Sequence, residues 1–359
     1  MKIVLDRADF LRALEFQVSK ETRSLSDVYT LVLLSTDSGV LKLRSTNGEQ
    51  LAESWSQAEI IKAGSAALKY DLLYDLIKNL STREVILEVV PEEQKAFILS
   101  GKSKYRLSLF DQSDLLLFHA HATQHLLTIS CLELKKVLML TSFVAKGQFL
   151  TDDVGKLLIS QIDKDTIEFA SSDSIRLCLL RVRFKGIKKI DTTAIPVQSL
   201  EAVRNYCSCL TDEDLIEIWV SDKFLTLKSE YANLSVLKTS TKFVDYNAFR
   251  DLEFGVSLIV SVSDMEKALK RLLGVTGEAR LIKLIPRKDK LVLFSRSAVM
   301  GDGEEEVDAE ALGTFSENNE PYMFNGAYLH DFFRLQTENE RARLDFSNPQ
   351  SVLKLRFED

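Results

Sequence analysis

The most constraining feature of this sequence is a pattern that occurs three times. A strand-like apolar run passes directly into a segment with the rhythm of an amphipathic helix, at residues 1–17, 126–143 and 258–274. A second helical segment follows each time, at residues 72–80, 199–207 and 328–336. Both segments recur about every 130 residues, and a shared period of that kind indicates three copies of one structural unit.

Runs of alternating apolar and polar residues, typical of half-buried strands, lie between and after the helical segments. Matching runs occur at residues 39–46, 165–172 and 289–296, and again at 85–90, 215–228 and 342–357. Each copy is therefore predicted to pack two helices on one face of an antiparallel sheet, which is an α+β fold. The predicted domains are residues 1–122, 123–253 and 254–359. Without a Gly/Ser-rich linker between them, they are expected to abut rigidly.

The starts of the first helices carry acidic residues. Asp9 and Asp264 lie near the beginnings of two of these segments. A carboxylate there can cap the free N–H groups and meet the positive end of the helix dipole. We expect both residues to do so.

The composition favours a cytoplasmic protein. The chain has 359 residues, and 45% of them are hydrophobic, enough for several cores. The N-terminus lacks the pattern of a signal peptide, and no apolar run approaches the length of a membrane span. The cysteines are sparse and form no C-x-x-C pair, which favours reduced thiols: Cys131, Cys178, Cys207 and Cys209.

Neither a metal site nor a catalytic site is predicted. His119, His121 and His125 lie close together, but no matching set of cysteines or carboxylates accompanies them. The phosphate-binding, dinucleotide-binding, zinc-protease and nucleophile-elbow motifs do not occur. Acidic pairs such as Asp152 and Asp153 lack histidine or lysine partners at a familiar spacing. We therefore expect a non-enzyme without a cofactor, and a repeat scaffold that binds only proteins is one alternative.

Basic residues recur at the same helix positions although the chain as a whole is acidic. The net charge is −7 and the isoelectric point about 5.4. Six positions in the repeat register are nevertheless basic: Arg12, Lys136 and Lys267 in the first helices, and Lys78, Arg204 and Arg334 in the second. They could be an ordinary solvated helix face. The functional alternative is a shared surface for a phosphate backbone, which is sequence-independent and salt-dependent. Lys20, Arg23, Lys135, Lys270 and Arg271 could add to it.

Several segments carry a resemblance to a known family. They are residues 1–14 with Arg23, the strand pair at 30–50, the segment 324–333, and the hydrophobic–Arg–hydrophobic tail at 351–357. Together with the triplication, they resemble the bacterial DNA polymerase III beta subunit, the beta sliding clamp, over essentially the whole chain. The resemblance implies that three domains form half of a ring and that two chains join head to tail. It further implies that helices line a hole for double-stranded DNA, and that the partners are a replicative DNA polymerase and a clamp loader.

The resemblance also implies a hydrophobic cleft for short peptide motifs near the junction of the second and third domains. Arg176 and Leu177 match the family's loop directly, whereas its glycine and histidine are absent. Val244 stands where the family has proline, and Phe249 where it has a smaller aliphatic residue. The predicted cleft residues are Val154, Ser172, Ile175, Arg176, Leu177, Val244, Phe249, Leu353, Leu355, Arg356 and Phe357.

A charge argument predicts the subunit interface. Residues 101–107 alternate basic and other side chains, as an exposed edge strand of the first domain would, and such edges invite pairing. An acidic run at residues 302–306 lies in the third domain. Opposite charges at the two ends favour head-to-tail closure, although the acidic run could equally be a solvated loop. The predicted interface residues are Lys102, Lys104, Tyr105, Leu107, Leu273, Val275, Glu304, Glu305 and Glu306.

The departures from the family leave a further alternative open. An accessory or mobile-element clamp would keep the fold with a different set of partners. A protein scaffold with a clamp fold would keep the architecture without encircling DNA.

Overall fold

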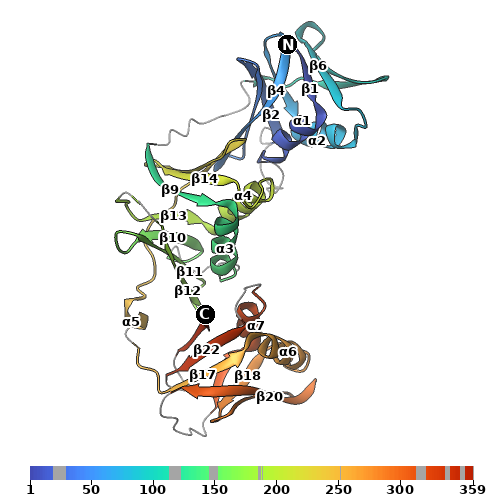
Figure 1. Ribbon diagram of the computed structural model, residues 1–359. Helices are drawn as coiled ribbons and strands as arrows, with labels where there is room; N and C mark the ends of the chain where they lie inside the picture. The colour runs from blue at the N-terminus through green and yellow to red at the C-terminus, as the bar shows by residue number, and fades with distance from the viewer. Residues whose placement is uncertain are drawn as a thin grey trace. The chain divides into compact units, whose positions relative to one another are not determined.

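The computed structural model describes residues 1–18, 30–112, 123–144, 153–184, 187, 189–250, 252–312, 321–335, 340–347 and 352–358, with the backbone alone at 248 and 250. These residues form antiparallel sheets covered by helices, which confirms the predicted α+β class (Figure 1). The chain divides into two compact units, Met1–Val244 and Asp245–Asp359. The first unit holds two of the repeated copies and the second unit holds one. The three-domain boundaries at 122 and 253 stay a prediction.

The first copy contains two helices and eight strands among the described residues. In chain order they are β1 (Lys2–Asp6), α1 (Arg7–Glu15), β2 (Leu31–Asp37), β3 (Val40–Thr46), β4 (Gln50–Lys62), β5 (Ser65–Lys69), α2 (Tyr70–Asn79), β6 (Glu84–Val90), β7 (Lys95–Ser100) and β8 (Ser103–Ser108), with a 3₁₀ turn η2 (Pro91–Glu93) before β7. Strand β1 pairs with both β4 and β6. Strand β8 pairs only with β7 within the described part of the chain.

The second copy repeats this order. Its elements are β9 (Gln124–Ser130), α3 (Cys131–Ser142), β10 (Lys156–Gln161), β11 (Thr166–Ser172), β12 (Leu177–Arg183), β13 (Thr193–Pro196), α4 (Val197–Ser208), β14 (Leu215–Val220), β15 (Phe224–Lys228) and β16 (Ala232–Leu237). Strands β10 to β13 form a separate four-stranded sheet. The last strand, β16, pairs antiparallel with β4 of the first copy, so one twelve-stranded sheet runs through both copies. This shared sheet explains why they form one compact unit.

The third copy forms the second unit. A short helix α5 (Asn247–Arg250) precedes β17 (Val256–Ser261), α6 (Val262–Leu273), β18 (Leu281–Pro286), β19 (Lys290–Ser297), β20 (Gly301–Leu312), β21 (Tyr322–Asn325), α7 (Gly326–Phe333), β22 (Arg341–Phe346) and β23 (Leu353–Glu358). Strand β17 pairs with β20 and β22, as β1 pairs with β4 and β6. Strand β23 therefore matches β7, and the described residues contain no counterpart of β8 in this copy.

Hydrophobic periodicity accounts for the cores. Each copy has its own cluster of buried side chains, and in each a pair of helices lies against the sheet. On α6, Met265, Ala268, Leu269 and Leu272 are buried, which is the i, i+3, i+4, i+7 spacing of one helix face. The residues between them are polar or charged and lie outside the core.

Polar side chains cap the first helix of every copy, but they are not the two carboxylates expected. Asp6 accepts a hydrogen bond from the N–H of Asp9 at 3.4 Å, and Ser261 accepts one from the N–H of Asp264 at 3.3 Å. Ser130 caps α3 in the same way. The prediction that Asp9 and Asp264 act as caps is therefore wrong. Both lie in the first helical turn, where they donate to the cap and meet only the helix dipole.

Candidate nucleic-acid and partner-binding surfaces

The basic positions singled out by the repeat lie on the outer sides of paired helices. Helix α1 packs with α2, α3 with α4, and α6 with α7. Each cation is kept out of the buried face of its helix. Lys78, Lys136, Lys267, Arg271 and Arg334 are exposed, and Arg12 and Arg204 are half-buried. Lys20 and Arg23 lie outside the described residues.

Two of these arginines are held by neighbours within the first unit. The Arg12 guanidinium lies 3.4 Å from the centroid of the Tyr231 ring, a cation–π contact between α1 and the turn before β16. Arg204 donates to Glu201 at 2.9 Å and also to the hydroxyl of Ser142. Both side chains are therefore fixed in place, and the charge of Arg204 is neutralised in part by its ion pair with Glu201.

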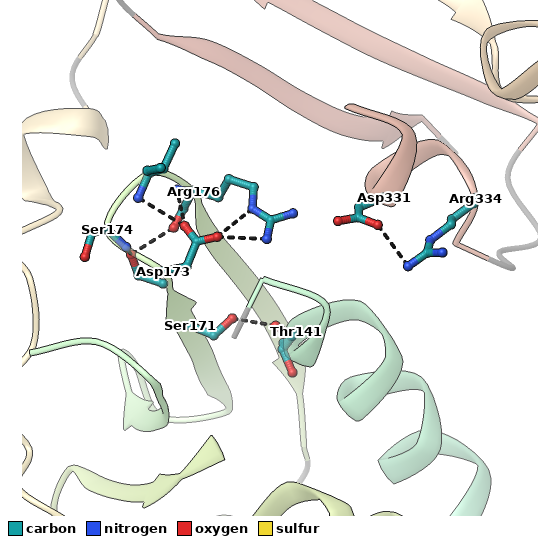
Figure 2. Close-up of polar contacts among 9 residues, drawn as sticks. Thr141, Ser171, Asp173, Ser174, Arg176, Asp331 and Arg334 are labelled. Atoms are coloured by element: carbon teal, nitrogen blue, oxygen red, sulfur yellow. Dashed lines mark hydrogen bonds and ion pairs between the residues drawn. The ribbon is translucent and has the colours of Figure 1, made fainter. Parts of the chain in front are cut away.

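The cations of the second unit differ in how far they are neutralised. Arg271 binds Glu305 through two hydrogen bonds, and Arg334 pairs with Asp331 at 2.9 Å (Figure 2). Lys267 makes no hydrogen bond or ion pair with any described residue. Lys270, also exposed, makes no such contact with the described residues either, so Lys267 and Lys270 are the predicted DNA-facing cations of this unit whose charges are most available. In the first unit, the candidate Lys135, on α3, pairs with Asp212 at 2.8 Å, and this hydrogen bond raises its pKa.

A tight turn between β11 and β12 forms the part of the predicted cleft that best matches the family. Asp173 accepts hydrogen bonds from the backbone N–H groups of Ile175 (3.0 Å) and Arg176 (2.6 Å), and from Nε of Arg176 (2.8 Å) (Figure 2). The hydroxyl of Ser172 donates to the backbone carbonyl of Arg176 at 2.8 Å. Ser174 adopts a φ of 76° at the tip, where glycine is favoured. The turn is therefore closed by its own side chains.

This turn presents an apolar side chain and hides a charged one. Ile175 is 73% exposed, whereas the Arg176 side chain is only 15% exposed and is paired with Asp173 at 2.8 Å. Val154 is buried, at 4% exposure. It lies beside the turn, because the backbone N–H of the next residue, Gly155, donates to the carbonyl of Ser172. Within the first unit, the structure thus brings together Val154, Ser172 and Leu177, and leaves Ile175 as the exposed apolar group.

The predicted tail residues divide between two faces of β23. Leu353, Leu355 and Phe357 pack toward the third core, and Phe357 stacks on Phe332 with ring centroids 4.4 Å apart. Arg356 points to the other face, where it pairs with buried Asp345 at 3.2 Å. Successive strand residues alternate between faces, so Arg356 cannot join the other three in one wall. That all four residues line the cleft stays a prediction. Phe249, on α5, is 46% exposed.

The predicted interface residues lie on two strand edges and one helix end. On β8, Lys104 and Tyr105 are exposed and Leu107 is half-buried, and Lys102 is exposed in the preceding turn. On β20, Glu305 binds Arg271 and Glu306 pairs with Lys290 at 2.7 Å, while Glu304 is exposed. Leu273 and Val275, which end α6, are half-buried.

Other functional chemistry does not emerge from the described residues. They contain no group of three or more histidine, cysteine or acidic side chains that could hold a metal ion, and His119 and His121 lie outside them. Burial raises the pKa of the Cys178 thiol to about 12 and also raises that of Cys207, so neither is ionised near neutral pH. Among the described helices, none combines the length and apolar character needed to cross a bilayer.

The repeated architecture and the matching turn motivate comparison with known proteins. Residues 1–117 match the family model for the N-terminal domain of the DNA polymerase III beta subunit. The beta sliding clamp of Rickettsia felis is 21% identical over 367 residues, which cover 99% of this chain and 96% of the relative. That of Staphylococcus aureus is 23% identical over 292 residues, covering 80% and 74%. The chain is thus similar to beta sliding clamps along nearly its whole length, at low identity.

Solved structures agree with the family in fold. The DNA polymerase III beta subunit of Pseudomonas aeruginosa superposes with a TM-score of 0.90 at 19% identity, covering 100% of this chain and 96% of that one. That of Thermotoga maritima gives 0.89 at 16% identity with the same coverage. The chain therefore has the fold of these beta subunits at low sequence identity.

Sequence reasoning missed one conspicuous residue near the predicted cleft. Lys156 is buried on β10 and donates to two backbone carbonyls of the segment that ends the first unit. A lysine inside an otherwise apolar run was the available signal. Its binding partners, however, are backbone atoms far along the chain, which no side-chain motif reveals.

Proposed function

We propose that this chain is a non-catalytic DNA sliding clamp. Two copies close head to tail into a ring around duplex DNA, and the ring tethers a replicative DNA polymerase and receives a clamp loader. Similarity to beta sliding clamps along nearly the whole chain supports the class of function. The names of its relatives associate them with DNA polymerase III, and that association is extended to this chain only as part of the proposal. Such a protein would act on DNA in the cytoplasm.

The observation that carries ring closure is the junction inside the first unit. There, the last strand of the second copy, β16, pairs with the long strand of the first copy, β4. The first copy has its own last strand, β8, and the third copy has its own long strand, β20. Strand β8 has a vacant edge among the described residues, and so does the beginning of β20 on the side away from β19. Pairing β8 with β20 of a second chain would repeat the internal junction.

The internal junction also predicts the register of this pairing. In the first copy, Tyr105 of β8 lies opposite Ile98 of β7. In the second copy, Leu234 lies opposite Leu227 in the equivalent strands β16 and β15, so Tyr105 corresponds to Leu234. Gly303 lies opposite Ser295 as Ala52 lies opposite Ser45. Since Leu234 pairs with Ala52 in the internal junction, Tyr105 is expected to pair with Gly303 of the second chain.

This register aligns complementary charges. One residue to either side of the Tyr105–Gly303 pair, Lys104 would face Glu304 and Arg106 would face Asp302. Opposite charges directly across antiparallel strands contribute about 0.2–1 kcal/mol per pair, and like charges oppose pairing. A Cβ at position 303 would lie 3.1 Å from Leu272 and Val275, so glycine is the residue that fits there. Charge therefore favours this alignment.

The paired helices of each copy carry the side chains proposed to bind DNA. Nine described cations of the predicted set stay at the surface, and in a dimer each would occur twice. Contacts of this kind hold a phosphate backbone without reading bases, so the ring could slide. The net charge of −7 would keep the rest of the surface from binding DNA.

The partner-binding part rests on the cleft predicted from the resemblance. Ile175, Leu177 and Val244 in the first unit, and Leu355 and Phe357 in the second, are apolar groups suited to a short hydrophobic peptide motif. The proposal places such a motif from the polymerase, and another from the loader, in that cleft.

The deciding experiment is retention on DNA of defined topology. The protein is loaded on nicked circular DNA, with a clamp loader supplied, and its retention is measured before and after linearisation together with its mass in solution. A dimer that stays on circles and leaves cut ends is the expected result. A monomer, or binding indifferent to free ends, would overturn the clamp mechanism and leave a protein scaffold with a clamp fold.

A further inference from the structure

A lysine ammonium lies buried beneath the segment that ends the first unit. Lys156 is 2% exposed, and its Nζ donates to the backbone oxygens of Ser240 and Lys242, both at 2.9 Å. Lysine is almost never buried unless its charge is met by acceptors. Here the acceptors lie 84 and 86 residues further along the chain, so the lysine ties β10 to a distant segment.

This segment, residues 238–244, crosses one face of the sheet β10 to β13, and we call it the strap. The N–H of Thr239 donates to the carbonyl of Ala194 at 2.9 Å, and Lys242 pairs with Asp153 at 3.3 Å. Phe243 packs on a small apolar cluster on the same face: Leu158, Ala170, Leu179 and Ala194. The strap is thus attached to the sheet by hydrogen bonds and packing. Among the described residues, Lys156 is the only buried charged group that binds it.

Lys156 also adjoins the predicted cleft within the first unit. Leu157 pairs with Ser171, so the preceding residue, Lys156, lies beside Ser172 in the same register. Ser172 in turn pairs with Leu177. The strap ends at Val244, directly after Phe243. Ser172 and Leu177 therefore lie next to Lys156 in the sheet, and Val244 follows two residues after Lys242, whose carbonyl Lys156 holds.

We propose that Lys156 is a positioning residue of the partner-binding surface. By holding the carbonyls of Ser240 and Lys242, it keeps the strap against the sheet and Val244 next to Ser172 and Leu177. It does not touch the partner. Without it, two buried carbonyls lose their donor, and the strap leaves its position. This inference rests on the proposed peptide-binding function and adds a residue that acts on it from beneath.

The test compares three full-length variants with the wild-type protein. Lys156→Met keeps the length of the side chain and removes the donor, whereas Lys156→Arg keeps a donor to the carbonyls. Lys238→Met is the matched control, because Lys238 also donates to a backbone carbonyl, that of Ser221 at 2.8 Å, but at the far end of the strap. The probe is a set of fluorescein-labelled peptides that tile the replicative polymerase of the same genome, and affinity is read by anisotropy.

The expected result is selective. Lys156→Met should weaken peptide binding about tenfold or more, since an unmet buried acceptor shifts an equilibrium by that order. Lys156→Arg and Lys238→Met should bind within about threefold of wild type. Hydrogen exchange at the amide of Thr239 should accelerate in Lys156→Met alone, while the dimer mass stays unchanged.

Two results would overturn the inference. One is wild-type peptide affinity in Lys156→Met despite faster exchange in the strap, which would make Lys156 purely structural. The other is equal loss of affinity in Lys238→Met. If Lys156→Met does not fold, the shorter Lys156→Gln takes its place, and wild-type affinity there together with faster exchange at the amide of Thr239 has the same meaning. If the wild-type protein binds no peptide, the proposed peptide-binding function is rejected, and the inference is rejected with it. Hydrogen exchange in the strap would still show separately whether Lys156 holds that segment.

Discussion

Arg271 and Glu305 join helix α6 to strand β20 through two hydrogen bonds, from Nε to Oε1 at 2.7 Å and from Nη2 to Oε2 at 2.6 Å. This geometry matches the fork of a guanidinium to both oxygens of a carboxylate. Arg271 was predicted to face DNA and Glu305 to face a second subunit. Each instead neutralises the other within one chain, so α6 offers less charge to DNA, and β20 less to a partner, than their sequences indicate.

Replacing Arg271 with alanine should raise the pKa of Glu305 toward the ordinary value for glutamate. The hydrogen bond from Arg271 is the largest cause of its lowered pKa. Because the folded-state pKa is lowered, the pair stabilises the fold above the ordinary glutamate pKa, and this contribution is lost as the pH falls through the lowered pKa. Carboxyl NMR titration measures the change. Arg334→Ala is the control, and an unmoved Glu305 titration in Arg271→Ala would contradict the assignment.

Reversing the charge of Lys104 should weaken the dimer, and reversing Glu304 as well should restore it. In the proposed dimer, the register of the internal β4–β16 junction would put these two residues opposite each other. Exchanging attraction for repulsion across the strands changes each of the two interfaces by about 1–2 kcal/mol, or roughly tenfold in its equilibrium constant. Sedimentation equilibrium of Lys104→Glu, Glu304→Lys and the double variant measures this. Failure of the double variant to recover would reject the predicted register.

Removing Lys78 and Lys267 should reduce the salt dependence of binding to duplex DNA. Lys78 is exposed on α2, and Lys267 is exposed on α6. Each phosphate contact contributes about 0.9 to the slope of log affinity against log salt, so the double alanine variant should lose about 1.8. Anisotropy of a labelled duplex over a salt series gives the slope. Lys288→Ala, an exposed lysine in the turn between β18 and β19, should leave it unchanged. Equal effects of the two variants would indicate a solvated helix face.

Truncating Leu269 to alanine should destabilise the third copy by about 3–5 kcal/mol, because Leu269 is fully buried on α6 and a cavity would remain. Leu132, on α3, is 41% exposed and should tolerate the same change with little effect. Urea unfolding followed by circular dichroism compares the two. Similar losses would contradict the assignment of the helix faces.

The sequence by itself determined the repeated architecture, because that information is local. Apolar side chains recur about every 3.6 residues on α6 and every 2 residues on β3 and β19, and this period depends only on which face of the element is buried. Every copy needs the same buried faces, so the pattern occurs three times and the repeat is visible without any contact being known. The turn at Arg176 and Leu177 was found in the same way, since its matching residues are consecutive.

Only the tertiary structure decided which charges remain available and which groups share a surface. Arg271 and Glu305 lie 34 residues apart, and Arg356 meets Asp345 only because β22 and β23 pair. Lys156 binds carbonyl oxygens, which every residue possesses, so no side-chain pattern could identify its partners. Pairing of this kind depends on strand register and helix packing, which emerge only when distant segments come together.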